Sequence, residues 1–220
     1  MRIAAIVPAA GRGERLGHGS PKALVRVGAV TLVAHAVAAM LRAGAETVVV
    51  AAPHDAIDDV RRHVPRAIVV PGGADRRASV LAALTAIPAD VDVVLVHDAA
   101  RPFAPDDMIQ RVVTALAAGA SAVIPVVPLA DTVKRVDASA VVVETIDRSA
   151  LRAVQTPQGF RRDVLAEAHA IQSGDVTDDA GLVEAMGVKV LTVEGDQRAF
   201  KVTTPWDLTV AELQWKRGEQ

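Results

Sequence analysis

The sequence contains no cysteine among its 220 residues. This absence excludes disulfide bonds, thiolate nucleophiles and zinc sites with cysteine ligands. The histidines, at positions 18, 35, 54, 63, 97 and 169, do not have the short spacings that are typical of metal ligands. The sequence therefore predicts neither a thiol enzyme nor a histidine-rich metal site.

The sequence also lacks an excess of charge of either sign, because its formal net charge is only -2. A general nucleic-acid or membrane-surface binder normally carries a basic excess. No apolar run is long enough to span a membrane, and the run after Met1 meets Pro8 and Gly11 too early for a secretory signal. We therefore expect a cytoplasmic protein with no nucleic-acid partner and no membrane partner.

Hydrophobic residues make up 51% of the chain, which is enough for a sizeable core in one domain, residues 1–220. Short β-branched runs alternate with amphipathic segments, and this alternation is typical of a doubly wound α/β fold with a mainly parallel sheet. The expected strands are 3–7, 47–52, 67–70, 91–96, 122–127 and 189–193. The expected helices are 31–43, 54–63, 75–87, 105–118, 161–171, 178–186 and 205–215.

The alternation breaks at residues 131–148, which have two extended runs around Asp137 and no helical face. This pattern predicts a β-hairpin arm. A two-stranded hairpin is marginal by itself, so we expect it to pair with a second subunit in a homodimer. The alternative is a flap that folds onto its own chain.

The first chemically suggestive stretch follows strand 3–7 directly. It contains Pro8, Ala9, Ala10, Gly11, Gly13, Arg15 and Lys22. Glycines let backbone N–H groups approach an anion, and the cations supply charge for a polyphosphate. The stretch matches neither the Walker loop nor the dinucleotide-binding loop, because no Gly-Lys-Ser/Thr occurs and Leu16 stands where a third glycine would be. An ordinary strand-to-helix turn with surface arginines is the alternative.

Three more clusters lie in loops that should meet at the carboxyl edge of the sheet. Gly73, Ala74 and Ser79 follow the strand at 67–70, and Asp98 ends the most apolar strand, close to Arg101. Lys201 precedes the last helix. A buried acid suits Mg²⁺ or a substrate, so Asp98 is the candidate metal ligand. The alternatives are a plain turn at 72–73, an Asp98–Arg101 ion pair, and a surface lysine at 201.

Taken together, the motifs resemble those of the 2-C-methyl-D-erythritol 4-phosphate cytidylyltransferase family, over nearly the whole chain. They are Pro8-Ala9-Ala10-Gly11 with Arg15 and Pro21-Lys22, Gly72-Gly73 with Arg76 and Ser79, His97-Asp98-Ala99-Ala100-Arg101-Pro102, Asp131-Thr132 with Lys134, Thr156-Pro157-Gln158, Thr177-Asp178-Asp179-Ala180, and Lys201-Val202-Thr203 with Pro205 and Asp207-Leu208. The sequence departs from the family pattern at Ala23-Leu24, where an aromatic residue is often found, and at Asp75, where Glu is common.

The resemblance implies a Mg²⁺-dependent enzyme that joins CTP to methylerythritol phosphate and releases pyrophosphate. It implies that Arg15 and Lys22 stabilise the transition state, and that Arg148 and Lys201 position the acceptor phosphate. Contacts to cytosine would come from Gly73, Ala74 and Ser79. Contacts to the acceptor or metal would come from Asp98 and Arg101, and Thr132 with Arg148 would reach the site of a neighbouring subunit. The sequence ends at Gln220, so we expect no fused cyclase domain.

Two alternative functions stay open at the level of sequence. The enzyme could transfer CMP to another polyol phosphate such as ribitol 5-phosphate, because the loop and cytosine motifs would serve both reactions. From a different class, the chain could be a nucleotide-binding module without catalysis. The cations at Arg15, Lys22 and Lys201 argue against the second alternative, because a binding module does not need to stabilise a leaving group.

Overall fold

A central sheet of eight strands organises the computed structural model, which describes residues 1–11, 21–171 and 177–218. Four neighbouring parallel strands form its middle and one side: β5 (Ile68–Pro71), β4 (Thr47–Ala52), β1 (Ile3–Pro8) and β6 (Val93–Val96). On the other side, β7 (Ala122–Pro128) pairs in parallel with β12 (Val190–Glu194). The predicted α/β fold with a mainly parallel sheet is confirmed.

Two antiparallel strands in this sheet were not predicted. The short strand β11 (Gln158–Arg161) lies between β6 and β7, and β10 (Arg152–Val154) pairs with the end of β7. In the sequence, this region carries only the Thr156-Pro157-Gln158 family motif. The run is short and half polar, so it lacks the signal of a buried strand. Gly159 fits there because a Cβ would lie 2.5 Å from the Leu116 side chain, where a helix packs closely on the sheet.

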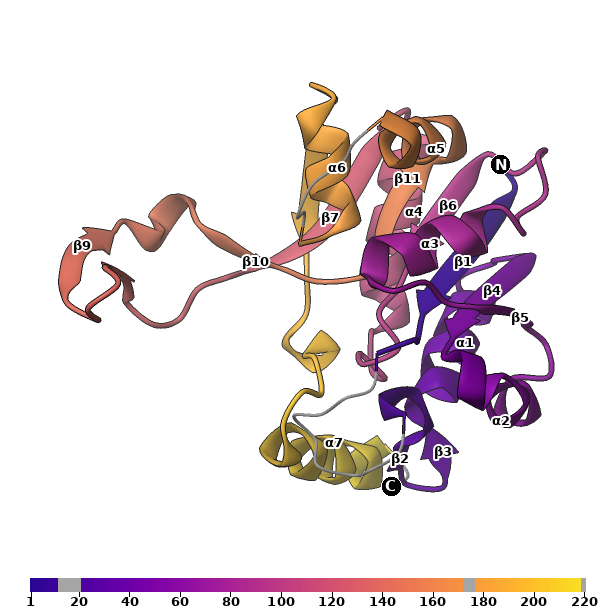
Figure 1. The fold of residues 1–220 in the computed structure, drawn as a ribbon. Helices are drawn as coiled ribbons and strands as arrows, with labels where there is room; N and C mark the ends of the chain where they lie inside the picture. Colours follow the sequence, from indigo (N-terminus) through magenta and orange to yellow (C-terminus); the bar gives the residue numbers. More distant parts are fainter. Residues whose placement is uncertain (12–20, 172–176, 219–220) are drawn as a thin grey trace.

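Helices cover both faces of the sheet (Figure 1). The helices α1 (Leu32–Arg42), α2 (Ile57–His63) and α4 (Asp106–Ala117) pack on one face with Ala5 and Val7 of β1. The other face carries α3 (Arg76–Leu84), α5 (Arg162–Ile171) and α6 (Asp179–Ala185), packed with Ala4 and Ile6. Successive β1 residues thus face opposite layers, as the two-residue period of a strand requires. Buried on both faces, β1 is apolar throughout.

Local capping fixes where several helices begin. Thr31 accepts a hydrogen bond from the Ala34 N–H at 3.4 Å, which confirms it as the N-cap of α1. Asp75 caps α3 through the Ala78 N–H at 2.7 Å, and Asp178 caps α6 in the same way. Side-chain oxygens of this kind satisfy donors that a helix start leaves unpaired.

The last helix, α7 (Pro205–Gly218), lies apart from the two main layers (Figure 1). It packs against the small hairpin β2 (Arg26–Val27) and β3 (Val30–Thr31), which the sequence analysis did not predict. Gly28 turns this hairpin with a positive φ of 61°, and a Cβ there would collide with the Trp215 ring. Among the described residues, no helix has the length and apolar character needed to cross a membrane.

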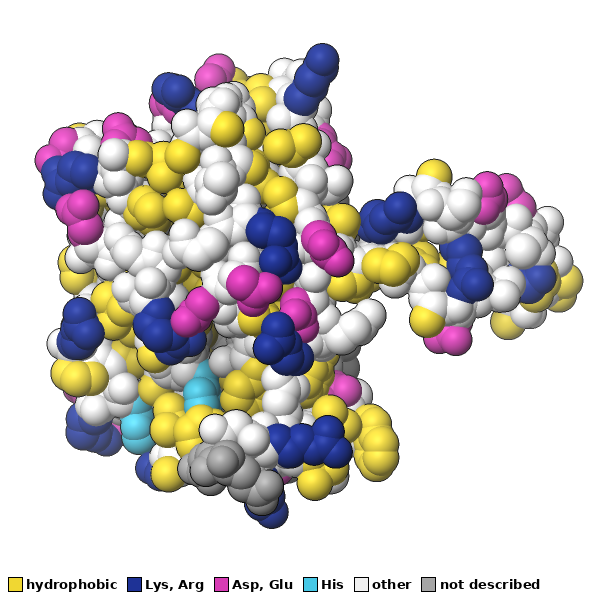
Figure 2. All heavy atoms as spheres, turned by 180° about the vertical axis from the view of Figure 1, so that it is seen from behind, with side chains coloured by type: hydrophobic (Ala, Val, Ile, Leu, Met, Phe, Trp, Pro, Cys, Tyr) yellow, Lys and Arg dark blue, Asp and Glu magenta, His cyan; other side chains and the backbone are white. Residues whose placement is uncertain are grey.

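The predicted hairpin arm is present and projects from the body (Figure 1). Its strands, β8 (Val133–Val136) and β9 (Val142–Ile146), form an antiparallel pair of their own, separate from the main sheet. Apolar, basic and acidic side chains are interspersed along it (Figure 2). Val136, Val141, Val142 and Val143 are each more than half exposed. The arm therefore shows apolar surface that its own body does not cover.

Candidate active site

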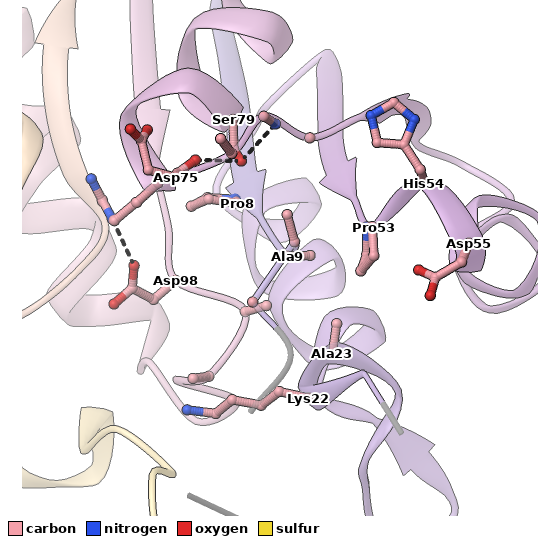
Figure 3. A pocket seen from close by; sticks show the side chains of 18 of the residues that line it. Pro8, Ala9, Lys22, Ala23, Pro53, His54, Asp55, Asp75, Ser79 and Asp98 are labelled. Atoms are coloured by element: carbon pink, nitrogen blue, oxygen red, sulfur yellow. Dashed lines mark hydrogen bonds and ion pairs between the residues drawn. The ribbon is translucent and has the colours of Figure 1, made fainter. Parts of the chain in front are cut away.

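A cavity of about 820 Å³ opens at the carboxyl edge of the sheet, where the loops after β1, β4, β5 and β6 meet (Figure 3). Parallel strands place their ligand-binding loops at this edge. The predicted site residues that line the cavity are Pro8, Ala9, Ala10, Gly11, Lys22, Gly73, Ala74, Ser79, Asp98 and Lys201. Clusters far apart in the sequence thus come together in one place.

The loop after β1 forms one wall of the cavity. Ala9 continues the strand pairing, because its N–H donates to the Ala51 carbonyl at 2.8 Å. Lys22 begins a 3-10 helix, Lys22–Leu24, directly after Pro21. The Lys22 side chain lines the cavity together with Gly11. Gly13 and Arg15, the other predicted residues of this stretch, lie outside the described residues.

The loop between β5 and α3 forms a second wall and depends on glycine. A Cβ on Gly72 would lie 2.5 Å from the Cβ of Ala10, so this loop can approach the β1 loop only because residue 72 is glycine. The Gly73 N–H donates to Ser79 Oγ at 3.1 Å, and Ser79 Oγ donates to the Asp75 carbonyl at 2.8 Å. Buried Ser79 therefore shapes the loop that carries Gly73 and Ala74.

Asp98 is the electrostatic centre of the cavity. Its carboxylate lies 2.8 Å from Lys201 Nζ, 3.6 Å from Arg76 Nε and 3.9 Å from Arg101 Nε. Burial alone would raise the pKa of Asp98, but Lys201 and Arg76 outweigh burial and lower it to about 2. The predicted ion pair with Arg101 is present, and two cavity-lining cations join it. Asp98 is therefore ionised at neutral pH.

A buried hydrogen-bond chain holds the backbone of Asp98. The Asp98 N–H donates to Thr156 Oγ1 at 3.0 Å, and Thr156 Oγ1 lies 3.0 Å from His97 Nδ1. His97 Nε2 lies 3.2 Å from the carbonyl of Arg101, which can only accept, so Nε2 carries the proton and Nδ1 accepts from Thr156. Burial lowers the pKa of His97 to about 4, so the ring is neutral at neutral pH. These hydrogen bonds therefore fix the backbone of the loop after β6.

Among the predicted site residues that the structure describes, three do not line this cavity. Arg101 points its guanidinium to the carbonyls of Ala199, at 2.7 Å, and Val154, at 3.2 Å. Thr132 and Arg148 stand exposed at the base of the arm, where Arg148 donates to the carbonyl of Leu129 at 3.2 Å. Neither arm residue is among the described residues that line the cavity of its own chain.

Several residues in and around the cavity were given no role from the sequence. Arg76 stands at the first turn of α3, lines the cavity and contacts both Asp98 and buried Asp179. His54 and Asp55 line the far rim, after β4. His54 and Asp55 could have been found from the sequence, because they directly follow a central strand and the same rule located the other loops. Asp179 stands in one of the family motifs, but nothing local in the sequence indicated what it contacts.

A metal site made of protein groups alone is absent from the described residues, because nowhere in them do three or more His, Asp or Glu side chains gather with suitable geometry. Mg²⁺ bound to a nucleotide needs only one or two carboxylates, since phosphates and waters supply its other ligands. Ionised Asp98 meets that requirement. The described lining of the cavity combines three lysine and arginine cations with three carboxylates, Asp55, Asp75 and Asp98, and the cations suit a pair of phosphorylated ligands.

Comparison with known proteins agrees with this geometry. The family model described as 2-C-methyl-D-erythritol 4-phosphate cytidylyltransferase matches residues 3–217. A protein of that name from Frankia casuarinae is 56% identical over 213 residues, covering 96% of this chain and 80% of the relative. One from Rhodococcus opacus is 48% identical over 218 residues, covering 98% of this chain and 96% of the relative.

Solved structures lead to the same family. The crystal structure of 2-C-methyl-D-erythritol 4-phosphate cytidylyltransferase from Thermus thermophilus is 39% identical, with a TM-score of 0.83, and the match covers 98% of this chain and 100% of that one. The bifunctional IspDF from Campylobacter jejuni is 27% identical with a TM-score of 0.83, and the match covers 95% of this chain and 54% of that one. The chain belongs to the 2-C-methyl-D-erythritol 4-phosphate cytidylyltransferase family.

Proposed function

We propose that the cavity holds CTP and 2-C-methyl-D-erythritol 4-phosphate side by side, so that the acceptor phosphate attacks the α-phosphorus of CTP. As a member of its family the chain is a nucleotidyltransferase, which forms 4-diphosphocytidyl-2-C-methyl-D-erythritol and pyrophosphate for isoprenoid synthesis. A phosphate oxygen bonds to the α-phosphorus, and the bond to the bridging oxygen of pyrophosphate breaks. The supporting observation is that Lys22, Arg76 and Lys201 line one cavity around Asp98.

The triphosphate half of the site is assigned to the β1 loop. The backbone of Pro8, Ala9, Ala10, Gly11 and Gly13 would lie along the phosphates. Lys22, together with Arg15, would neutralise the charge that builds on the leaving pyrophosphate. No protein nucleophile is needed, because positioning and charge stabilisation are sufficient for phosphoryl chemistry of this type.

The cytosine is assigned to the loop between β5 and α3. Ser79 Oγ already accepts from the Gly73 N–H and donates to the Asp75 carbonyl, and its second lone pair suits the amino group of cytosine. The exposed backbone of Gly73 and Ala74 would complete the contact. A base with a carbonyl at that position would offer no proton to Ser79, and this difference would favour CTP over UTP.

The acceptor half is assigned to Asp98 and Lys201. Lys201 would bind the acceptor phosphate, and the carboxylate of Asp98 would accept from an acceptor hydroxyl or bind the metal. Arg101 would act mainly through Asp98, because its Nε lies 3.9 Å from that carboxylate while the rest of its guanidinium donates to the carbonyls of Ala199 and Val154.

Mg²⁺ is proposed as the cofactor, with Asp98 as its protein ligand. When bound, the ion would neutralise phosphate charge and help to align the triphosphate. The chemistry of the residues fits this role, since Asp98 is a buried and ionised carboxylate that lines the cavity. The protein residues themselves bind and orient the two anions.

A homodimer formed through the arm is proposed to complete each site. Thr132 and Arg148 lie at the base of the arm, away from the cavity of their own chain, while the family resemblance gives both a contact to the acceptor. The apolar surface of β8 and β9 would be covered by a second copy of the chain. Arg148 of one subunit would then face Lys201 and Asp98 of the other.

Pyrophosphate release tests the assignment of the acceptor. The enzyme is incubated with CTP and Mg²⁺, with methylerythritol phosphate or ribitol 5-phosphate as acceptor, and with EDTA as a metal-free control. We expect rapid release only with methylerythritol phosphate and loss of release with EDTA. Equal or faster release with ribitol 5-phosphate would reassign the acceptor, and CTP binding without release from either would indicate a binding module.

A cytoplasmic location stays a prediction, which cell fractionation would test.

A further inference from the structure

Asp179, at the first turn of α6, is a completely buried carboxylate outside the cavity. Burying an ionised carboxylate is costly unless it has charged or hydrogen-bonding partners. Asp179 has two. Its Oδ1 lies 3.0 Å from Nε2 of buried His169, and its Oδ2 lies 2.6 Å from a guanidinium nitrogen of Arg76. One carboxylate oxygen therefore faces α5 and the other faces α3.

His169, on α5, holds the Asp179 carboxylate in place. Because the Asp179 oxygen is the acceptor of this hydrogen bond, Nε2 of His169 carries a proton and donates it. The carbonyl of His169 also accepts from Arg77 at 2.9 Å, so α5 is tied to the residue next to Arg76. His169 and Asp179 thus hold the start of α3 against α5 and α6.

Arg76 connects the buried Asp179 to the cavity. One end of its planar guanidinium is fixed by Asp179, while its Nε lies 3.6 Å from Asp98, which in turn lies 2.8 Å from Lys201. Charges of opposite sign therefore alternate from Asp179 through Arg76 and Asp98 to Lys201. A planar fork can bridge two carboxylates in a fixed geometry, which a lysine in its place could not do.

We propose that Asp179 is a positioning residue for the acceptor half of the site, acting through Arg76 on Asp98 and Lys201. The proposal rests on the acceptor site proposed above. Without the charge of Asp179, the guanidinium of Arg76 turns toward Asp98 alone and competes with Lys201 for its carboxylate. The acceptor is then held out of line, while the triphosphate contacts at Lys22 stay intact.

Asp178 provides a matched control on the same helix. Its Oδ1 caps α6 through the Gly181 N–H at 3.0 Å, and its Oδ2 accepts from Gln158 at 2.7 Å. Asp178→Asn and Asp179→Asn therefore remove the same charge one residue apart, and only the second removes the hydrogen-bonded partner of Arg76, which Asp178 affects through a weaker charge interaction alone. A purely structural role would lower the thermal stability of both variants without a selective effect on one substrate.

The test measures steady-state kinetics of both variants with CTP and with methylerythritol phosphate varied in turn. For Asp179→Asn we expect kcat/KM for the acceptor to fall about ten- to a hundredfold, since a small misplacement of reacting groups costs that much, while KM for CTP stays nearly constant. For Asp178→Asn we expect no selective loss. Equal effects of the two variants, or a parallel rise in KM for CTP, would overturn the proposal.

Arg76→Lys gives a second readout if Asp179→Asn does not fold. Arg76 is partly exposed, so the lysine variant should fold, and we expect it to show the same acceptor-selective loss. Where Asp179→Asn does fold, the losses in kcat/KM should not add in the double variant with Arg76→Lys, because both substitutions break the contact between Arg76 and Asp179. Additive losses, or normal acceptor kinetics for Arg76→Lys, would contradict the proposal. Pyrophosphate release by the unaltered enzyme is measured first, so a failure of the proposed function is recognised separately.

Discussion

The cavity and the arm differ in how they are stabilised. At the cavity, Asp98 is buried, its carboxylate meets three cations, and its backbone is held by Thr156 and His97. In the arm, the strands pair only with each other within the described chain, and the valines at 136 and 141–143 are exposed. The cavity is preorganised inside one chain, whereas the arm lacks a surface to pack against. This contrast supports the proposals that the cavity binds the substrates and that the arm binds a second subunit.

The largest expected effect comes from the cavity. Replacing Lys22 by alanine should lower kcat by about 10²–10³-fold, the cost of removing one electrostatic stabiliser of a transition state, and should change KM for CTP much less. The charge is needed most when pyrophosphate leaves. Steady-state kinetics with CTP varied would check this, and equal losses in kcat and CTP affinity would contradict this role of Lys22.

The pH dependence of stability tests how firmly the cavity loop is buried. The unfolded His97 takes up a proton near its usual value of 6.5, whereas the pKa of the folded ring is about 4 because the ring is buried. Between these values the unfolded state binds more protons, so the free energy of unfolding should fall as the pH drops, by roughly 3 kcal/mol in total. Burial also lowers the pKa of His35, which adds a change of the same sign.

His97→Gln separates the contribution of His97 from the rest. Glutamine can donate to the Arg101 carbonyl and accept from Thr156, as the neutral imidazole does, but it does not titrate. Urea unfolding at several pH values should therefore give a flatter profile for this variant between pH 6.5 and 4. An unchanged slope would show that His97 is not the group responsible. Asp98 contributes only below its usual pKa of 3.8, since its folded pKa is about 2.

In the arm, the double variant Val142→Ser, Val143→Ser should weaken self-association. Neighbouring strand residues face opposite sides, so the pair removes one apolar side chain from each face. The loss of buried apolar area should raise the dimer Kd about ten- to a hundredfold. Sedimentation over a concentration series measures the Kd. Ile68→Ser on β5 is the matched control, because Ile68 is similarly exposed but lies on the opposite side of the sheet. The same Kd for double variant and unaltered protein would exclude the arm from the interface.

A smaller effect is expected at Gly72. In Gly72→Ala the new methyl group meets the Cβ of Ala10, so the loops after β1 and β5 must separate. We expect CTP affinity to fall about tenfold, which corresponds to roughly 1.4 kcal/mol. Gly218→Ala, at the end of α7, is the control, because a Cβ at Gly218 would meet no atom within 4 Å. Calorimetric titration with CTP would compare the two variants, and equal affinities would contradict the packing argument.

Much of this architecture could be predicted from local pattern. Strands such as β4 are β-branched apolar runs, and Thr31 is a recognisable cap, so element type and order followed from short segments. The strand β11 could not be predicted, because Gln158 and Gly159 in this short strand carry no strand signal and fit only against neighbouring elements. Strand order in the sheet depends on such long-range contacts.

The site was predictable as a set of loops but not as a network. The rule that loops at the carboxyl ends of strands converge placed Gly73, Ser79 and Asp98 together, and the structure bears this out. The links from Asp98 to Arg76, and from Arg76 to Asp179, join segments distant in the sequence, and no local pattern encodes such pairings. Whether Arg148 faces a partner's cavity depends on a second chain and stays a prediction.

A subunit-mixing experiment tests the central claim, that each active site combines the cavity of one subunit with the arm of another. Lys22→Ala and Arg148→Ala proteins, each nearly inactive, are unfolded together and refolded as an equal mixture. Random pairing should restore activity to about a quarter of all sites, because half of the dimers are mixed and each contains one intact site. Activity at that level is the predicted result. No recovery, with mixed dimers demonstrated by distinct affinity tags, would contradict the account.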